Sequence, residues 1–472
     1  MKSVQQALLW FTADKYRWLL AVTAIAVGFI TSGPALYFRL HNPAYRGIDL
    51  LGADNEASYL AQAQEMLDGH YNLGNIYLAD HKNDPYVLQP LAGFVMAALA
   101  KLLDVSVTDV NLITKTVFPA LLTVLAFLFF RDVFRNPACA LAATVGVMMA
   151  PASYLVLNPA ALWTFFTKGQ FLYANLNFLA YARPINPQFS FLFFFGYLIC
   201  LWRFLFIAQT VRQRRLYGLL SSIILGLSFY TYFFAYSYAL IWTALMGLWA
   251  IGTKRWAEVK GLLAIGLGAL VLALPYLSNT LHLIQSPLYG ELVGRLGVGY
   301  NHTPIFSRVL WGTLVLFTIV ARRAPKEIRL WVYTILLAGA IGTNQQLLTG
   351  RTVPIPNHYY WFFIQPFATV TLVYLGYYVL ERWRTAALIY TASVLVLFFI
   401  AGIVFQLQSN QVQLPSFLSE QRYAPLIHTL NHTLPKDATV FANNTISGLL
   451  PVYSDLNIYQ LEGMGEIGRA HV

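Results

Sequence analysis

The stretch Gly52-Ala53-Asp54-Asn55-Glu56-Ala57-Ser58-Tyr59 follows the first long apolar run of the chain and opens a segment with helical periodicity. The apolar residues that come next fall on one face of a helix, namely Leu60, Ala63, Met66 and Leu67. We therefore expect Asp54 and Glu56 to head an amphipathic helix that lies along a membrane surface. A site at this position would face both lipid and the surrounding water.

The composition of the chain is that of a membrane protein. Of its 472 residues, 58% are hydrophobic and only 11% are charged, whereas soluble globular chains carry about 25% charged residues. Several apolar runs have the roughly 20 residues that a helix needs to cross about 30 Å of hydrocarbon, including Trp18–Phe38, Asn111–Phe130, Phe189–Gln209 and Ala386–Gln406. The net charge of +11 does not indicate nucleic acid, because the basic residues lie between the apolar runs.

The apolar segment Leu88–Leu103 decides the predicted topology, because it is short and contains Lys101. If it spanned the membrane, the next basic clusters would face outside. If it lies in the interface, the basic clusters all fall on one side: Lys2, Lys15 and Arg17; Arg131 and Arg135; Arg212, Arg214 and Arg215; Lys254 and Arg255; Arg322 and Arg323; Arg382 and Arg384. The positive-inside rule favours this second arrangement, with a cytoplasmic N-terminus in the plasma (inner) membrane and an extracytoplasmic site.

The predicted fold class is an all-α polytopic membrane protein with about 11 transmembrane helices. The first outer loop, residues 39–110, would hold two juxtamembrane helices, and residues 1–408 would form the membrane module. The run Leu216–Ile251 would fold as two short spans that turn near Tyr230–Tyr236. Residues 409–465 would start an extracytoplasmic α/β domain, with an amphipathic helix, a turn and a strand at Ser419–Leu430, Pro435-Lys436-Asp437 and Thr439–Ala442.

The last seven residues, Glu466-Ile467-Gly468-Arg469-Ala470-His471-Val472, are what the sequence GAGATCGGAAGAGCACACGTC encodes. This sequence matches a widely used sequencing adapter, whose next codon in that frame is the stop TGA. We expect residues 466–472 to be an artefact and the natural protein to continue into a larger outer domain. Re-amplification of the locus from source DNA tests this, and a genomic frame that stops directly after Val472 would refute it.

The layout resembles that of the GT-C membrane glycosyltransferases, which use polyprenyl-phosphate or polyprenyl-diphosphate sugar donors. Glu56-Ala57-Ser58-Tyr59 resembles the acidic-x-x-aromatic turn of protein mannosyltransferases and aminoarabinose transferases. Gln89-Pro90-Leu91, followed by Lys101-Leu102-Leu103, resembles their Pro-Pro-Leu element. Those families usually have adjacent Asp-Glu, whereas the pair here is split as Asp54-Asn55-Glu56. Which carboxylate is catalytic therefore stays open.

The resemblance implies a hexosyl or pentosyl transfer to a lipid, glycan or protein acceptor on the extracytoplasmic face, by a single displacement with inversion. Asp54 or Glu56 would accept the proton of the acceptor. The purely structural alternative is that Asp54 caps the helix and Glu56 stabilises its first turn.

The departing phosphate would need positive charge, for which Arg183, Arg351 and His358 are candidates, with Tyr59 as a further substrate contact. The planar guanidinium group of arginine binds phosphate through two hydrogen bonds. The alternative is that these arginines reach from span ends to the interface without binding substrate.

A divalent cation is another candidate, and its donor atoms would come from five residues: Asp54, Glu56, Asp80, His81 and Asp84. Their spacing does not match a metal-binding signature. The tyrosines 230, 232 and 236 are typical of an interfacial aromatic belt.

Two other functions remain open. A multi-span transporter or lipid-linked-glycan flippase would carry ionisable residues deep inside its spans, where this chain has few, such as Lys115 and Arg203. A polysaccharide polymerase or ligase would share the donor chemistry but use a large outer loop late in the chain.

Overall fold

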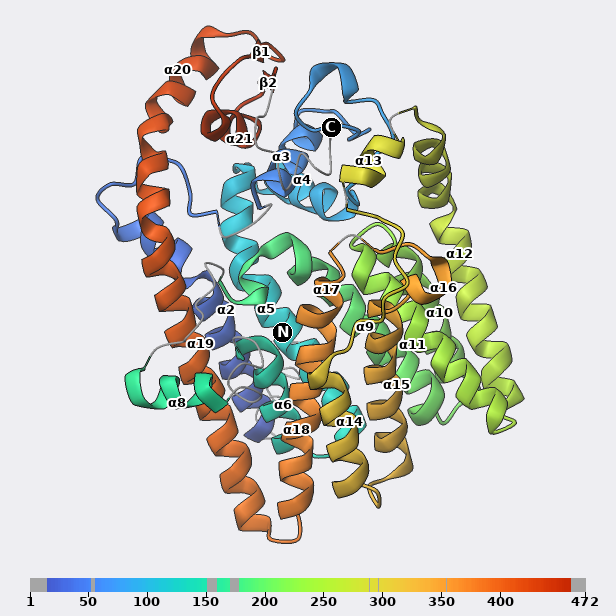
Figure 1. The fold of residues 1–472 in the computed structure, drawn as a ribbon. Coiled ribbons are helices and arrows are strands. Elements are labelled where there is room, and N and C mark those ends of the chain that lie inside the picture. Colours follow the sequence, from blue (N-terminus) through green and yellow to red (C-terminus); the bar gives the residue numbers. More distant parts are fainter. Residues whose placement is uncertain are drawn as a thin grey trace, which may run out of the picture.

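The computed structural model describes residues 15–51, 56–150, 159–169, 178–287, 289–295, 297–353 and 355–459. Asp54 lies outside the described residues, as does the stretch 466–472 that resembles an adapter. Most of the described chain is helical, and the long helices form a bundle (Figure 1). The bundle helices are α2 (Lys15–His41), α5 (Val107–Phe134), α6 (Pro137–Met149), α9 (Ser190–Trp202), α10 (Val211–Ser228), α11 (Phe233–Gly252), α12 (Trp256–Gln285), α14 (Arg308–Val320), α15 (Lys326–Thr343), α18 (Gln365–Leu380) and α19 (Arg384–Glu420).

The chain is a multi-pass membrane protein. Within the described ranges, 7 helical segments are long and apolar enough to cross a membrane: Tyr16–His41, Val107–Phe134, Ile185–Ile207, Phe233–Gly252, Trp256–Gln285, Asn357–Leu380 and Arg384–Thr433. Three shorter helices are also apolar, at Leu91–Leu103, Pro137–Met149 and Arg308–Val320. The predicted total of about 11 spans stays a prediction.

Local signals in the sequence set several helix boundaries. Helix α5 begins after Ser106, whose hydroxyl accepts the backbone N–H of Asp109 while the Asp109 carboxylate accepts the backbone N–H of Ser106. This reciprocal cap satisfies two donors at the helix start. The apolar run 216–251 breaks at residues 229–232, between α10 and α11, as the sequence predicts.

Helices α2 and α5 pack closely against each other, and residues 42–106, which lie within the predicted first outer loop, connect them. A Cβ atom at Gly28 of α2 would lie only 2.5 Å from the carbonyl oxygen of Thr116 on α5. The absence of a side chain at Gly28 therefore allows the backbones to approach. The buried hydroxyl of Thr31 adds a hydrogen bond of 3.1 Å to the carbonyl of Lys115.

Two short helices, α3 (Glu56–Leu67) and α4 (Leu91–Leu103), pack together at one end of the bundle. In Figure 1 they lie at the same end as α13 (Tyr289–Arg295) and the C-terminal elements. Between them lies a single turn, η1 (Ala79–His81). These are the two helices that the sequence predicts for the first outer loop.

The C-terminal part forms a small unit against α3. Helix α19 continues beyond the apolar run that ends near residue 406 and reaches Glu420. The turn η6 (Gln421–Tyr423) then leads into α20 (Ala424–Thr433), β1 (Thr439–Val440), α21 (Asn444–Tyr453) and β2 (Asn457–Ile458). Strands β1 and β2 pair in parallel. The predicted amphipathic helix 419–430 is therefore split by η6, and the larger α/β domain stays a prediction.

The remaining elements connect the bundle helices. They are α8 (Pro159–Lys168), η2 (Ala180–Ala182), η3 (Pro184–Phe189), η4 (Arg203–Ile207), α16 (Gln346–Thr349), α17 (Asn357–Tyr359) and η5 (Tyr360–Ile364). Of these, η3 and α17 matter for the site, because η3 begins directly after Arg183 and α17 contains His358.

Candidate functional site

Glu56 is the first residue of α3, and its carboxylate is buried against α5. The Nζ atom of Lys115 lies 2.6 Å from Oε1 of Glu56. The side-chain amide of Asn111 donates a hydrogen bond of 2.6 Å to the same oxygen. The other oxygen, Oε2, is buried and finds no hydrogen-bond partner among the described residues. Lys115 and Asn111 thus both bind Oε1 of Glu56, whereas Oε2 has no partner among the described residues.

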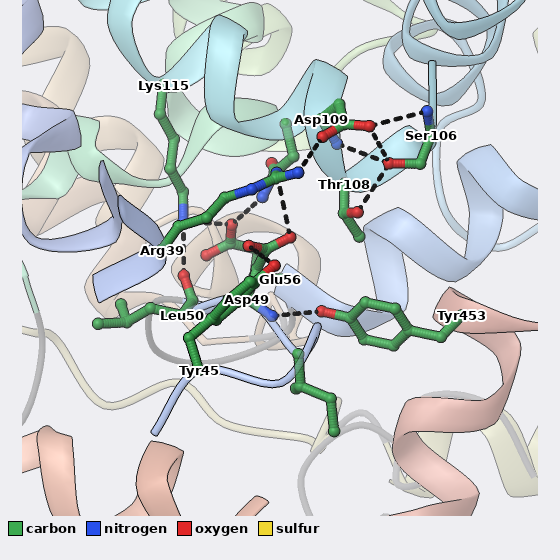
Figure 2. Close-up of polar contacts among 12 residues, drawn as sticks. Arg39, Tyr45, Asp49, Leu50, Glu56, Ser106, Thr108, Asp109, Lys115 and Tyr453 are labelled. Carbon is green, nitrogen blue, oxygen red and sulfur yellow. Dashed lines mark hydrogen bonds and ion pairs between the residues drawn. The ribbon is translucent and has the colours of Figure 1, made fainter. Parts of the chain in front are cut away.

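Lys115 joins the acidic turn to the loop that precedes it. Its side chain is only 4% exposed, and Nζ also donates a hydrogen bond of 3.1 Å to the carbonyl oxygen of Leu50 (Figure 2). The sequence shows Lys115 as one of the few ionisable residues within the apolar runs, and the structure adds its partners. A long side chain on α5 can reach the outer loop, and a buried ammonium requires a counter-ion.

A second buried carboxylate, Asp49, lies in the loop between α2 and α3. Its Oδ1 accepts a hydrogen bond of 3.0 Å from the hydroxyl of Tyr45, and its Oδ2 lies 3.7 Å from Nη1 of Arg39. Burial raises the pKa of Asp49, although the positive charge of Arg39 acts in the opposite direction. Arg39 also contacts Asp109 on α5 at 2.5 Å. Sequence reasoning missed this network, because the position of Asp49 in a loop gives no sign that its carboxylate is buried.

Three of the predicted substrate contacts gather around Tyr232, the residue that precedes α11. The hydroxyl of Tyr232 lies 2.5 Å from Nδ1 of His358. Burial raises the pKa of Tyr232 well above its ordinary value; the phenol of Tyr59 raises it further, whereas the charge of Arg183 lowers it. The same guanidinium acts electrostatically on His358. Tyr59, Arg183 and His358 therefore lie within electrostatic reach of one group.

The segment that follows Arg183, η3, packs against α5 and α9. The Nε atom of Arg183 donates to the backbone carbonyl of Asn186, which turns the guanidinium back over η3. Ile185 and Phe189 of η3 belong to the same apolar cluster as Tyr59 of α3. Tyr232, assigned from sequence to an aromatic belt, instead contacts a candidate site residue, and its neighbour Tyr236 bonds the hydroxyl of Tyr276 at 2.9 Å. Only the tertiary contact with His358 distinguishes Tyr232 from the other tyrosines.

The first turn of α3 connects the two groups. Glu56 and Tyr59 are three residues apart on this helix, so their Cβ atoms are neighbours at about 5–6 Å. Glu56 faces Lys115 and Asn111, while Tyr59 lies near Tyr232. One turn of α3 thus carries both the Glu56 carboxylate and Tyr59, the residue that lies near Tyr232.

Arg351 lies elsewhere. Its guanidinium is fully exposed and stacks over the ring of Tyr300, 5.2 Å from the ring centroid. Nη2 of Arg351 also donates a hydrogen bond of 3.2 Å to the Tyr300 hydroxyl. The structure does not bring this arginine together with Arg183 or His358.

The residues considered for a divalent cation do not gather in the part of the chain that the structure describes, which contains no group of three or more such side chains suited to a metal. Asp80 is exposed, and His81 pairs with Asp84 at 2.8 Å. Glu56 is buried with Lys115. Because Asp54 lies outside the described residues, a cation at the acidic turn stays a prediction.

No protein-family model and no curated protein matches this sequence. Solved structures match it in fold. ArnT from Cupriavidus metallidurans bound to undecaprenyl phosphate is 11% identical with a TM-score of 0.55, and the match covers 96% of this chain and 88% of ArnT. The archaeal oligosaccharyltransferase AglB from Archaeoglobus fulgidus, in complex with an inhibitory peptide and a dolichol-phosphate, is 12% identical with a TM-score of 0.51. That match covers 95% of this chain and 64% of AglB, so the chain spans less than two thirds of the archaeal enzyme.

The chain is therefore similar in fold to these two GT-C membrane enzymes. The apo form of ArnT matches in the same way, at 12% identity and a TM-score of 0.52, over 95% of this chain and 86% of ArnT. The fold suggested by the acidic turn and the layout of the sequence is thereby confirmed.

Proposed function

We propose that this protein transfers a sugar from a polyprenyl-phosphate donor to a lipid, glycan or protein acceptor on the extracytoplasmic face of the plasma membrane. The fold supports this proposal, because two enzymes that share it have solved structures with undecaprenyl phosphate or dolichol-phosphate. The positive-inside rule supports the orientation, with a cytoplasmic N-terminus. A diphosphate donor would use the same cationic group.

The observation that carries the proposal is the first turn of α3, where Glu56 pairs with Lys115 and Tyr59 acts electrostatically on Tyr232. Tyr232 in turn contacts His358 and is under the influence of the charge of Arg183. A displacement with inversion brings the acceptor to the face of the anomeric carbon opposite the departing phosphate. It therefore needs a proton acceptor and a cationic group that are close but separate. We propose that Asp54 is the proton acceptor and that Arg183 supplies the positive charge.

Within this site, we assign the role of base to Asp54 and a positioning role to Glu56. A proton accepted by Glu56 would neutralise it and leave the Lys115 ammonium buried without its counter-ion, which costs several kcal/mol. Glu56 is better suited to hold α3 against α5 through Lys115 and Asn111. Asp54, two residues earlier in the sequence, is the other carboxylate of the acidic turn and our candidate for acceptor activation.

The departing phosphate would be bound by Arg183, with His358 and Tyr59 as further hydrogen-bonding groups. Arginine suits this role because its guanidinium donates two parallel hydrogen bonds to phosphate oxygens. Tyr232 would hold His358 in place through its hydroxyl. Arg351 lies outside the proposed site.

The transporter alternative predicts ionisable residues deep within the spans that line a path. The two examples named from the sequence, Lys115 and Arg203, each have an acidic partner. Lys115 pairs with Glu56, and Nε of Arg203 lies 2.6 Å from Oδ2 of Asp132. An ion pair therefore accounts for each of these two charges, and no transport path is needed to explain them.

The test uses membranes that contain the full chain. They are supplied with a panel of undecaprenyl- and dolichyl-phosphate sugars, radiolabelled in the hexose or pentose, and label is followed into lipid, glycan and protein fractions. We expect transfer from at least one donor and its loss in Asp54→Asn membranes. If correctly inserted protein transfers label from none of these donors, the proposed function is wrong.

A further inference from the structure

The loop that leads from α2 to the acidic turn has no regular secondary structure at residues 48–51, yet it is buried there. Ile48, Asp49 and Leu50 are each 7% exposed or less. Buried backbone N–H and C=O groups need hydrogen-bond partners. In this loop the partners are side chains from distant parts of the chain.

Two of these partners come from the C-terminal segment 421–459. The side-chain amide of Gln421 donates a hydrogen bond of 2.7 Å to the carbonyl of Ile48, and its Oε1 accepts one of 2.9 Å from the backbone N–H of Arg46. The hydroxyl of Tyr453, at the end of α21, accepts a hydrogen bond of 2.9 Å from the backbone N–H of Asp49 (Figure 2). Lys115 binds the next carbonyl, that of Leu50.

Apolar packing and a backbone hydrogen bond hold the C-terminal segment beside the loop. Ile446 and Leu450 of α21 share one apolar cluster with Ile48 and with Leu60 of α3. The backbone N–H of Ile458 in β2 donates a hydrogen bond of 3.1 Å to the carbonyl of Tyr77 in the first outer loop. The segment therefore touches the first outer loop on both sides of α3.

We propose that Gln421 and Tyr453 are positioning residues, through which the C-terminal segment holds the loop before the acidic turn in its catalytic geometry. The inference rests on the proposed function, because the anchored residues 46–50 lead along the chain to the acidic turn that carries the proposed base. The bonds to residues 46, 48, 49 and 50 leave this stretch little freedom. A small displacement of a catalytic group lowers the rate sharply even when binding persists.

The test replaces Tyr453 by Phe, which removes the hydroxyl and keeps the ring, in the full chain in membranes. The matched control is Tyr459→Phe, because Tyr459 is exposed on the same segment and contacts Phe441 rather than the loop. With the radiolabelled donor that gives the highest parental rate, we expect kcat to fall about ten-fold in Tyr453→Phe with little change in the KM for the donor. Tyr459→Phe should behave like the parent.

Amide hydrogen exchange separates this inference from the proposed function, because it needs no activity. In Tyr453→Phe, exchange at the Asp49 amide should rise about ten-fold, since its acceptor is lost. Gln421→Leu, which removes both bonds to the loop, should raise exchange at Arg46 in the same way. Parental exchange at both amides would overturn the inference even if transfer is observed. If the parent transfers no sugar, raised exchange upholds the anchoring while the proposed function fails.

Discussion

The Nζ atom of Lys115 and Oε1 of Glu56 lie 2.6 Å apart, with side chains that are 4% and 1% exposed. Loss of one partner of a buried ion pair leaves an uncompensated charge and costs about 3–5 kcal/mol. We therefore expect Lys115→Met to lower the thermal midpoint strongly, and the double variant Lys115→Met/Glu56→Gln to lower it less. Thermal unfolding in detergent, followed by size-exclusion chromatography, measures the difference. A parental midpoint for Lys115→Met would show that the pair does not contribute to stability.

The two acidic residues of the turn should differ in their effects. Asp54→Asn removes the proposed base and should lower the transfer rate by about 10²–10⁴-fold with a parental thermal midpoint. Glu56→Gln removes the counter-ion of Lys115 and should lower stability as well as activity. Initial rates and thermal midpoints, measured on the same preparations, distinguish the two. Parental activity of Asp54→Asn would refute its role as base.

The two candidate arginines form a matched pair. Arg183 acts on Tyr232 and His358, whereas Arg351 stacks on Tyr300 at the surface. Since hydrogen bonds to charged groups are worth about 1.5–3 kcal/mol, Arg183→Gln should lower kcat/KM for the donor by about 10–100-fold. Arg351→Gln should leave it close to the parental value. If Arg351→Gln lowers kcat/KM more than Arg183→Gln does, Arg351 and not Arg183 binds the phosphate of the donor.

The raised pKa of Asp68, which lies where the first outer loop meets the C-terminal segment, makes the stability of the protein depend on pH. Burial, and then the carboxylate of Asp455, raises the pKa of Asp68 to about 7; Glu65 also raises it and Lys436 lowers it. The folded protein keeps this proton while the unfolded chain loses it near pH 4. The contribution of this group to stability is therefore full below about pH 4 and is lost as pH rises toward about 7.

Asp68→Asn should remove this loss. We expect the variant to be more stable than the parent above pH 7 by roughly 1 kcal/mol, after allowance for solvent screening of this partly exposed group, and to match the parent near pH 4. Thermal midpoints from pH 4 to pH 8 test the sign. A variant that is less stable than the parent at pH 8 would contradict it. Asp80→Asn, at an exposed position in the same loop, is the control.

Much of the architecture could be predicted because it depends on local patterns. Long apolar runs indicate membrane helices, and the short run with Lys101 indicates α4. The break between α10 and α11 was also predicted. The end of α19 was not, because its last turns, up to Glu420, are polar and lie beyond the apolar run. The end of an apolar run indicates where a helix leaves the lipid, but the helix itself can continue beyond that point.

The sequence by itself determined the fold class, the acidic turn at the head of α3 and the choice of Arg183, His358 and Tyr59 as candidates. Tertiary structure alone decided which groups meet: Lys115 with Glu56, and Tyr232 with His358. The physical reason is that periodicity and hydropathy act over neighbouring residues, whereas buried charges and hydroxyls take partners from elsewhere in the chain. Those partners become adjacent only when the helices pack.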